Sequence, residues 1–282
     1  MIRNILVGYD HSRSSQAALQ QALDIAEAAQ SWLHLVYVDE TAVREDGLEL
    51  LSSISVEDHG IVAAATAEEG AFAPEPPPPV EAEIPVLTAG AEACYQAHVP
   101  YDTQRLFGAP GERLAHLARL QQLLVVGESS EPRRGMRHHL GPNLRFLLRN
   151  CPVPLLVCNY NYRAMDSALV VYQDDAAGGR ALSLAGVLCS ALNIPLTVAI
   201  AGRTVEDPDT LVAELELALR VFHVEHEIQV LDRTVAEVVS LVPMEWAARC
   251  VVLAYPPLVW PWNVNAIRAA MATPNLMRLI VP

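Results

Sequence analysis

The same pattern of residues begins each half of the sequence, and this internal repeat limits the possible folds more than any other feature. Ile5–Leu19 ("ILVGYDHSRSSQAAL") aligns without a gap with Ala168–Leu182 ("ALVVYQDDAAGGRAL"). In both copies a short apolar run leads into a polar turn and then into residues with helical spacing. Self-similarity of this kind indicates one structural unit present twice.

Short apolar runs alternate with helical segments in both copies, which predicts a parallel sheet covered by helices. Helices are expected to begin near Ser14 and to occupy residues 108–120, where leucine and alanine recur three and four positions apart. The expected strands lie at residues 4–10, 33–38, 102–107, 123–127 and 154–160, and again at 168–173, 194–201, 225–231, 250–255 and 276–282.

The predicted fold class is therefore α/β, with two tandem, open, parallel five-stranded sheets flanked by helices, as in Rossmann-like folds. The domains are expected at residues 1–160 and 166–282, with a linker between them. The alternative is a single larger doubly wound sheet. Because the edge strand of an open sheet has unpaired backbone groups, the terminal strands 154–160 and 276–282 are expected to pair with each other.

Residues 41–85 belong to neither copy. They contain "APEPPPPVEAEIP", whose prolines exclude a helix interior or a central strand and favour extended chain. Loops of this length inside compact domains are either functional lids or disordered segments. We expect a surface insertion that is mobile at residues 71–85, with a lid over the strand ends as the alternative.

Charge and composition exclude several classes of protein. A formal charge of -14 argues against a nucleic-acid partner, which requires a basic surface. All 19 basic residues are arginines, so no lysine is present for Schiff-base chemistry or a Walker-type phosphate site. No apolar run approaches the length of a membrane helix, and the N-terminal residues resemble a strand instead of a signal peptide. The five scattered cysteines predict reduced core residues of a cytoplasmic protein.

Four motifs of the first half belong together: "ILVGYDHSRSSQAAL", "LHLVYVDE", "FGAPGERLAHLA" with "LLVVG", and "LGPNLRFLLRNCPVPLLVC". In these motifs the chain resembles a tandem universal stress protein. The second half matches in the order of its elements and only loosely in motif. The resemblance implies small cytoplasmic α/β domains that pair through their last strands, some of which bind ATP.

ATP-binding members of that family carry G-x-x-G, nine residues, and then G-[S/T], so that glycine N–H groups and a hydroxyl meet the phosphates at a helix N-terminus. Gly127 matches the first glycine, but Ser130 replaces the second, and residues 131–140 make the spacer one residue longer. Pro142 follows Gly141 and supplies neither an N–H nor a hydroxyl. We therefore expect ATP binding to be weak or absent.

The resemblance nevertheless marks a set of nucleotide-contacting positions at the strand ends. Asp10 would accept hydrogen bonds from ribose or cap the following helix, with Ser12 and Ser14 as rival caps. The positions implied are Asp10, Val38, Val126, Gly127, Ser130, Gly141 and Asn143. Arg133, Arg134 and Arg137 either compensate as phosphate partners or form an exposed basic loop.

The second copy is predicted to be degenerate. Gln173 stands where the first copy has Asp10, and "LAYPPLVWPWNVN" replaces the glycine loop. No catalytic motif or metal site is predicted anywhere in the chain. Three functions stay open: a regulator that senses or holds an adenine nucleotide, a nucleotide-free interaction module that binds a protein partner or forms a homodimer, and an enzyme on a related fold.

Overall fold

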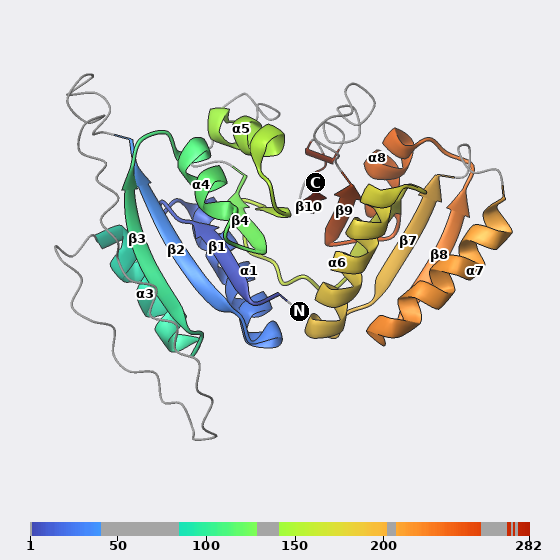
Figure 1. The fold of residues 1–282 in the computed structure, drawn as a ribbon, viewed down its shortest axis with the longest axis horizontal. Coiled ribbons are helices and arrows are strands. Elements are labelled where there is room, and N and C mark those ends of the chain that lie inside the picture. Colours follow the sequence, from blue (N-terminus) through green and yellow to red (C-terminus); the bar gives the residue numbers. More distant parts are fainter. Residues whose placement is uncertain are drawn as a thin grey trace.

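The computed structural model describes residues 2–40, 85–128, 141–201, 207–254, 270–271, 273 and 276–282. These residues form an α/β structure in which helices cover both faces of one large, mostly parallel sheet (Figure 1). Its strands are β1 (Asn4–Gly8), β2 (Trp32–Asp39), β3 (Tyr101–Phe107), β4 (Leu123–Gly127), β5 (Leu155–Cys158), β6 (Ala168–Tyr172), β7 (Leu196–Ala201), β8 (His226–Leu231), β9 (Cys250–Ala254) and β10 (Met277–Val281). Each lies where the sequence predicted a strand.

The two halves of the sheet have the same strand order and meet at β5 and β10. The order is β3-β2-β1-β4-β5-β10-β9-β6-β7-β8 in the described part of the chain. Neighbours within each half are parallel, whereas β5 and β10 are antiparallel, with Leu156 opposite Leu279. The expected pairing of the terminal strands is confirmed.

The structure corrects the expectation of two separate sheets. Hydrogen bonding runs without interruption from β3 to β8, so the two five-stranded sets are halves of one ten-stranded sheet in the described residues. The physical reason is that β5 and β10 would each be an open edge, and pairing them satisfies the backbone groups of both. In Figure 1 the first half (blue and green) and the second half (yellow to red) lie on either side of this junction.

The helices bury side chains against the two faces of the sheet. One cluster of buried residues joins the sheet to α1 (Arg13–Ala29), α3 (Pro85–Gln96), α6 (Ala176–Leu192) and α7 (Pro208–Leu219). A second cluster joins the opposite face to α4 (Pro110–Ala118), α5 (Pro142–Asn150) and α8 (Val235–Glu245). A short 3-10 helix, η2 (Arg220–Phe222), follows α7. Both faces are covered, which explains why the inner strands such as β4, β6 and β9 read as continuous apolar runs, whereas the edge strands β3 and β8 contain polar residues.

The start and end of α1 follow from local chemistry. The Ser12 side chain caps the helix by accepting a hydrogen bond from the Ser15 N–H, and Gln30 ends it in the left-handed conformation. Sequence analysis missed α3, which begins at Pro85, the last residue of the expected insertion. The rest of that insertion lies outside the described residues, including residues 71–84 of the segment expected to be mobile.

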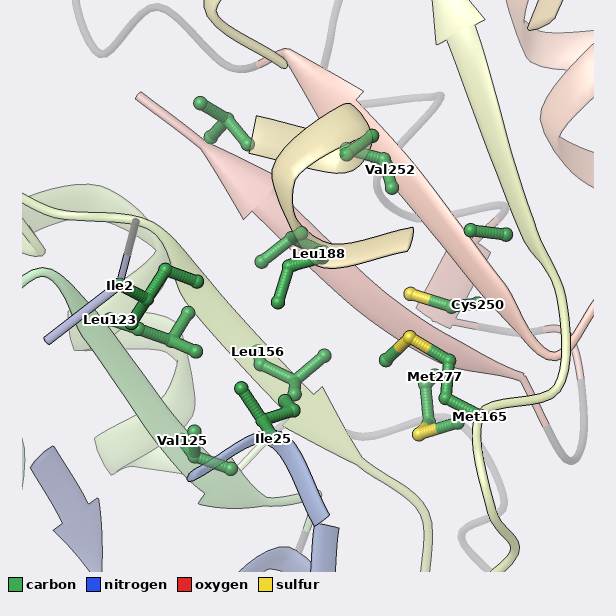
Figure 2. Packing of buried hydrophobic residues seen from close by; sticks show 14 of the residues in the cluster. Ile2, Ile25, Leu123, Val125, Leu156, Met165, Leu188, Cys250, Val252 and Met277 are labelled. Atoms are coloured by element: carbon green, nitrogen blue, oxygen red, sulfur yellow. The ribbon is translucent and has the colours of Figure 1, made fainter. Parts of the chain in front are cut away.

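The first of these clusters continues across the junction between the halves. Ile25 of α1, Leu156 of β5, Leu188 of α6 and Met277 of β10 lie in it together (Figure 2). All five cysteines are described and none forms a disulfide; Cys94, Cys158, Cys189 and Cys250 are buried, and Cys151 is half-buried. Burial raises the pKa of the Cys94, Cys158 and Cys189 thiols to about 12, so these thiols stay protonated at neutral pH. No helix among the described residues has the length and apolar character needed to cross a membrane.

The junction should carry a large share of the stability. Leu156 is fully buried opposite Leu279, whereas Leu120 is 78% exposed. We expect Leu156→Ala to lower the free energy of unfolding by about 2 to 5 kcal/mol, because it removes buried methyl groups and leaves a cavity. Leu120→Ala, the matched control, should change it by about 0.5 kcal/mol or less. Urea denaturation followed by circular dichroism measures both, and equal effects would show that the junction is not part of the cooperative core.

Candidate functional site

A pocket of about 370 Å³ opens at the carboxyl ends of β1, β2 and β4. This is the edge at which open parallel sheets bind ligands, and the volume suits a small molecule. The lining comes from the strand ends and from the first two turns of α1, α4 and α5. It consists of Gly8, Tyr9, Asp10, Ser12, Ser14, Ser15, Val36, Tyr37, Val38, Asp39, Glu40, Pro110, Leu114, Val126, Gly127, Asn143, Leu144 and Leu147.

The structure brings most of the described candidate residues together around this pocket. Those that line it are Asp10, Val38, Val126, Gly127 and Asn143. Gly141 caps α5 and is not among the lining residues. Ser130, Arg133, Arg134 and Arg137 lie outside the described residues.

Several lining residues were not singled out from the sequence. Tyr9, Tyr37 and Glu40 lie at or next to the carboxyl ends of β1 and β2. That position in the sequence could have identified them as lining residues. Pro110 and Leu114 come from α4, and only the folded chain brings that helix to the pocket. The order of elements along the chain does not show that α4 lies beside the pocket.

Asp10 supports the first turn of α1, although the N-cap itself is Ser12. The Ser12 N–H donates to the Asp10 Oδ1 atom at 3.0 Å, and the Asp10 N–H donates to the Ser15 Oγ atom at 3.3 Å. The carboxylate thus holds the turn between β1 and α1 in place. This structural role accounts for an aspartate at this position without a ligand.

Gly127 is required by packing. A Cβ atom at this position would lie 2.6 Å from both the backbone carbonyl carbon and the Oγ atom of Ser14, closer than nonbonded atoms approach. Only glycine therefore lets the end of β4 lie against the start of α1. Close packing is therefore enough to explain Gly127, the residue that matches the first glycine of the phosphate-binding motif.

Acidic side chains dominate the electrostatics of the pocket. Asp39 pairs with Arg105 of β3, whose Nη2 atom donates to Oδ2 at 2.5 Å. Asn143 of α5 donates to the Glu40 Oε1 atom at 3.3 Å, linking α5 to the end of β2. With Asp10, the lining holds three carboxylates, and no basic side chain is among its residues that the structure describes.

Proline removes one N–H donor from each of the two helix N-termini at the pocket. Both α4 and α5 have proline in the first turn, at Pro110 and Pro142, and neither N-cap side chain makes a capping hydrogen bond. The positive end of a helix dipole favours anions, but proline removes one of the N–H groups that would contact them. These helix starts offer anions a favourable field and an incomplete set of donors.

The titratable side chains in the described lining are carboxylates and tyrosines. Burial, followed by the charge of Asp10, raises the pKa of the Tyr9 hydroxyl, which lies 3.0 Å from the His11 Nδ1 atom. Tyr9 therefore stays protonated near neutral pH. Within the part of the chain that the structure describes, no group of three or more histidine, cysteine or acidic residues could hold a metal ion.

Comparisons with known proteins agree on one group. The model of a family described as the Universal stress protein family matches residues 1–159. A universal stress protein from Synechocystis is 25% identical over 89 residues, or 32% of this chain, and the match spans only 31% of that relative's length.

Two solved structures resemble the fold over its whole length. A universal stress protein from Archaeoglobus fulgidus matches with a TM-score of 0.67 at 12% identity, covering 99% of this chain and 95% of that one. A functionally unknown protein from Pseudomonas aeruginosa matches with a TM-score of 0.62 at 16% identity, covering 99% and 92%. At these identities the likenesses establish the fold alone.

The packing role of Gly127 can be tested with a matched glycine. Gly127→Ala should lower the free energy of unfolding by about 1 to 3 kcal/mol, because the new methyl group overlaps the Ser14 backbone. Gly179→Ala, in the first turns of α6, places its new methyl group where no atom lies within 4 Å, and should raise that free energy by up to about 1 kcal/mol. Thermal and urea unfolding report both changes. A tolerated Gly127→Ala would remove the packing explanation.

Proposed function

The chain belongs to the universal stress protein family, and on this premise we propose that it is a non-catalytic, cytoplasmic regulator of the stress response that acts through protein contacts and binds adenine nucleotides at most weakly. The observation that carries the proposal is the charge of the pocket. Asp10, Asp39 and Glu40 line it without a basic side chain in the described lining, and of these three carboxylates Asp39 is paired with Arg105 of β3.

An adenine nucleotide fits this pocket in size and position but poorly in its phosphate contacts. The strand ends and the volume suit a nucleoside, and Asp10 and Val38 are placed to meet one. Phosphates would meet carboxylates of like charge, and Pro142 offers them no N–H. A hydrogen bond to a charged group contributes roughly 1.5 to 3 kcal/mol, so two missing bonds weaken binding by roughly two to four orders of magnitude.

The second candidate is an ATP-dependent sensor of the same family. The position of the pocket at the carboxyl ends of β1, β2 and β4 favours it. Arg133, Arg134 and Arg137 are proposed as the charge partners of the phosphates in that case. Strong ATP binding by the intact chain would decide for this candidate.

We further propose two family-like domains, at residues 1–160 and 166–282, of which the second is degenerate and structural. Since β5 and β10 already pair within the chain, a homodimer would have to use a different surface. The edges of the described sheet, β3 and β8, are the strands left for such a contact or for a protein partner. Crosslinking with mass spectrometry identifies which surface is used.

ATP affinity tests the proposal directly. Calorimetry should give a dissociation constant weaker than roughly 100 μM, which corresponds to about 5.5 kcal/mol. Pro142→Ser should tighten binding, because it restores an N–H and adds a hydroxyl at the start of α5. Pro208→Ser, the same exchange in the first turn of α7, is the control and should leave affinity unchanged.

Ligand that copurifies with the protein also tests whether ATP binding is weak. Mass spectrometry of ligand released from freshly purified, denatured protein should find no stoichiometric nucleotide. ATP that copurifies one to one, or submicromolar affinity in the unmodified chain, would overturn weak binding and favour the sensor.

A further inference from the structure

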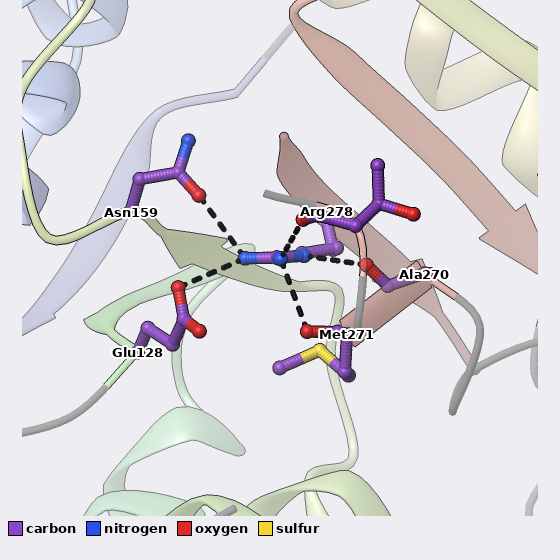
Figure 3. A network of polar contacts seen from close by, with 6 residues as sticks. Glu128, Asn159, Ala270, Met271 and Arg278 are labelled. Atoms are coloured by element: carbon purple, nitrogen blue, oxygen red, sulfur yellow. Dashed lines mark hydrogen bonds and ion pairs between the residues drawn. The ribbon is translucent and has the colours of Figure 1, made fainter. Parts of the chain in front are cut away.

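Arg278 of β10 is the largest polar side chain buried in the described structure. It is 1% exposed, and all five of its N–H donors have acceptors (Figure 3). The Nε atom donates to the Ala270 carbonyl at 3.0 Å; Nη1 donates to the Glu128 Oε2 atom at 3.2 Å and the Asn159 Oδ1 atom at 3.1 Å; Nη2 donates to the Met271 carbonyl at 3.3 Å and the Thr273 carbonyl at 2.6 Å.

These acceptors come from both halves of the chain. The three carbonyls precede β10 in the second half, whereas Glu128 and Asn159 directly follow β4 and β5 of the first half. The Glu128 N–H also donates to the Cys158 carbonyl at 2.9 Å, so the ends of β4 and β5 are held side by side. One guanidinium group thus fixes two strand ends of the other half.

The ion pair has a direct relation to the pocket. Glu128 is the next residue after Gly127, which lines the pocket and packs against Ser14. Burial lowers the pKa of the Arg278 guanidinium, and the charge of Glu128 acts in the opposite direction. A buried charge persists only with a compensating partner, so Arg278, which is buried, depends on Glu128, whose side chain is 35% exposed.

We propose that Arg278 is a positioning residue through which the second half sets the geometry and the charge of the first half's pocket. It holds the carboxyl end of β4 in place through Glu128 and neutralises the carboxylate of that residue, which directly follows the pocket-lining Gly127. The effect on ligands rests on the proposed function, whereas the effect on β4 does not.

Amide hydrogen exchange of the ligand-free chain tests the positioning role. In Arg278→Met, exchange should accelerate in residues 123–128 and 155–159, because both strand ends lose their common donor. Exchange in β1, β2, β7 and β8 should stay close to that of the unmodified chain. A uniform increase across the chain would show a role in global stability only and would overturn the inference.

Two milder variants keep the test decisive if Arg278→Met does not fold. Arg278→Lys keeps the charge but has three donors in place of five, and should give a smaller, equally local increase. Glu128→Gln keeps the shape of the side chain without its charge, and should loosen residues 123–128. Arg249→Met, which breaks the exposed pair with Asp166 inside the second half, is the control and should leave those residues unchanged.

ATP affinity shows whether the Arg278–Glu128 ion pair acts on the pocket through its charge. Removing the charge of Arg278 and removing that of Glu128 should change the affinity in opposite directions. Arg278→Met leaves Glu128 uncompensated and should weaken ATP binding about three- to tenfold, whereas Glu128→Gln leaves the guanidinium uncompensated and should tighten it by a similar factor. The double variant should return close to the original affinity. Weakening in both single variants would overturn the charge role.

The outcomes for the two proposals are distinguishable. Submicromolar ATP affinity in the unmodified chain would overturn the proposed function but would leave the local exchange result standing. Where ATP binding is too weak to measure in every variant, the exchange data alone decide whether Arg278 positions β4. Unchanged exchange at residues 123–128 in all three variants would overturn the inference regardless of ligand.

Discussion

The antiparallel pairing of β5 with β10 is the constraint on which the rest of the structure depends. It turns two five-stranded sets into one sheet, and it places α1 against α6 in a shared apolar core. It also brings β10 next to the ends of β4 and β5, where Arg278 finds its first-half acceptors. Without that pairing, Arg278 would have no carboxylate partner.

The pocket illustrates how residues that match a binding motif can have packing roles instead. Gly127 and Asp10 have sufficient structural causes, in the close approach to Ser14 and in the hydrogen bond from the Ser12 N–H. A match to a nucleotide motif at such positions is therefore weak evidence of a ligand. The discriminating features are the carboxylates and prolines, which bear on phosphate directly.

Most of the fold was predictable from the sequence, because strands and helices leave local periodic patterns. All ten described strands lie at expected positions, and α4 lies within the helix expected at residues 108–120. The helix α3 was missed, because its start adjoins the proline-rich segment. At the site, Asp10, Val38 and Gly127 were predictable from their places after strands, whereas Leu114 was not, because its helix reaches the pocket only through packing.

The sequence by itself determined the elements, their repetition and the edge of the sheet at which a ligand could bind, since apolar periodicity, turn residues and strand order are properties of short segments. Arg278 lies in the last expected strand, but no ion-pair partner for it was predicted from the sequence. Only the tertiary structure decided that the partner is Glu128, 150 residues away. The reason is that a guanidinium and a carboxylate at that separation meet through the packing of two distant strands, and no local pattern encodes which strands become neighbours.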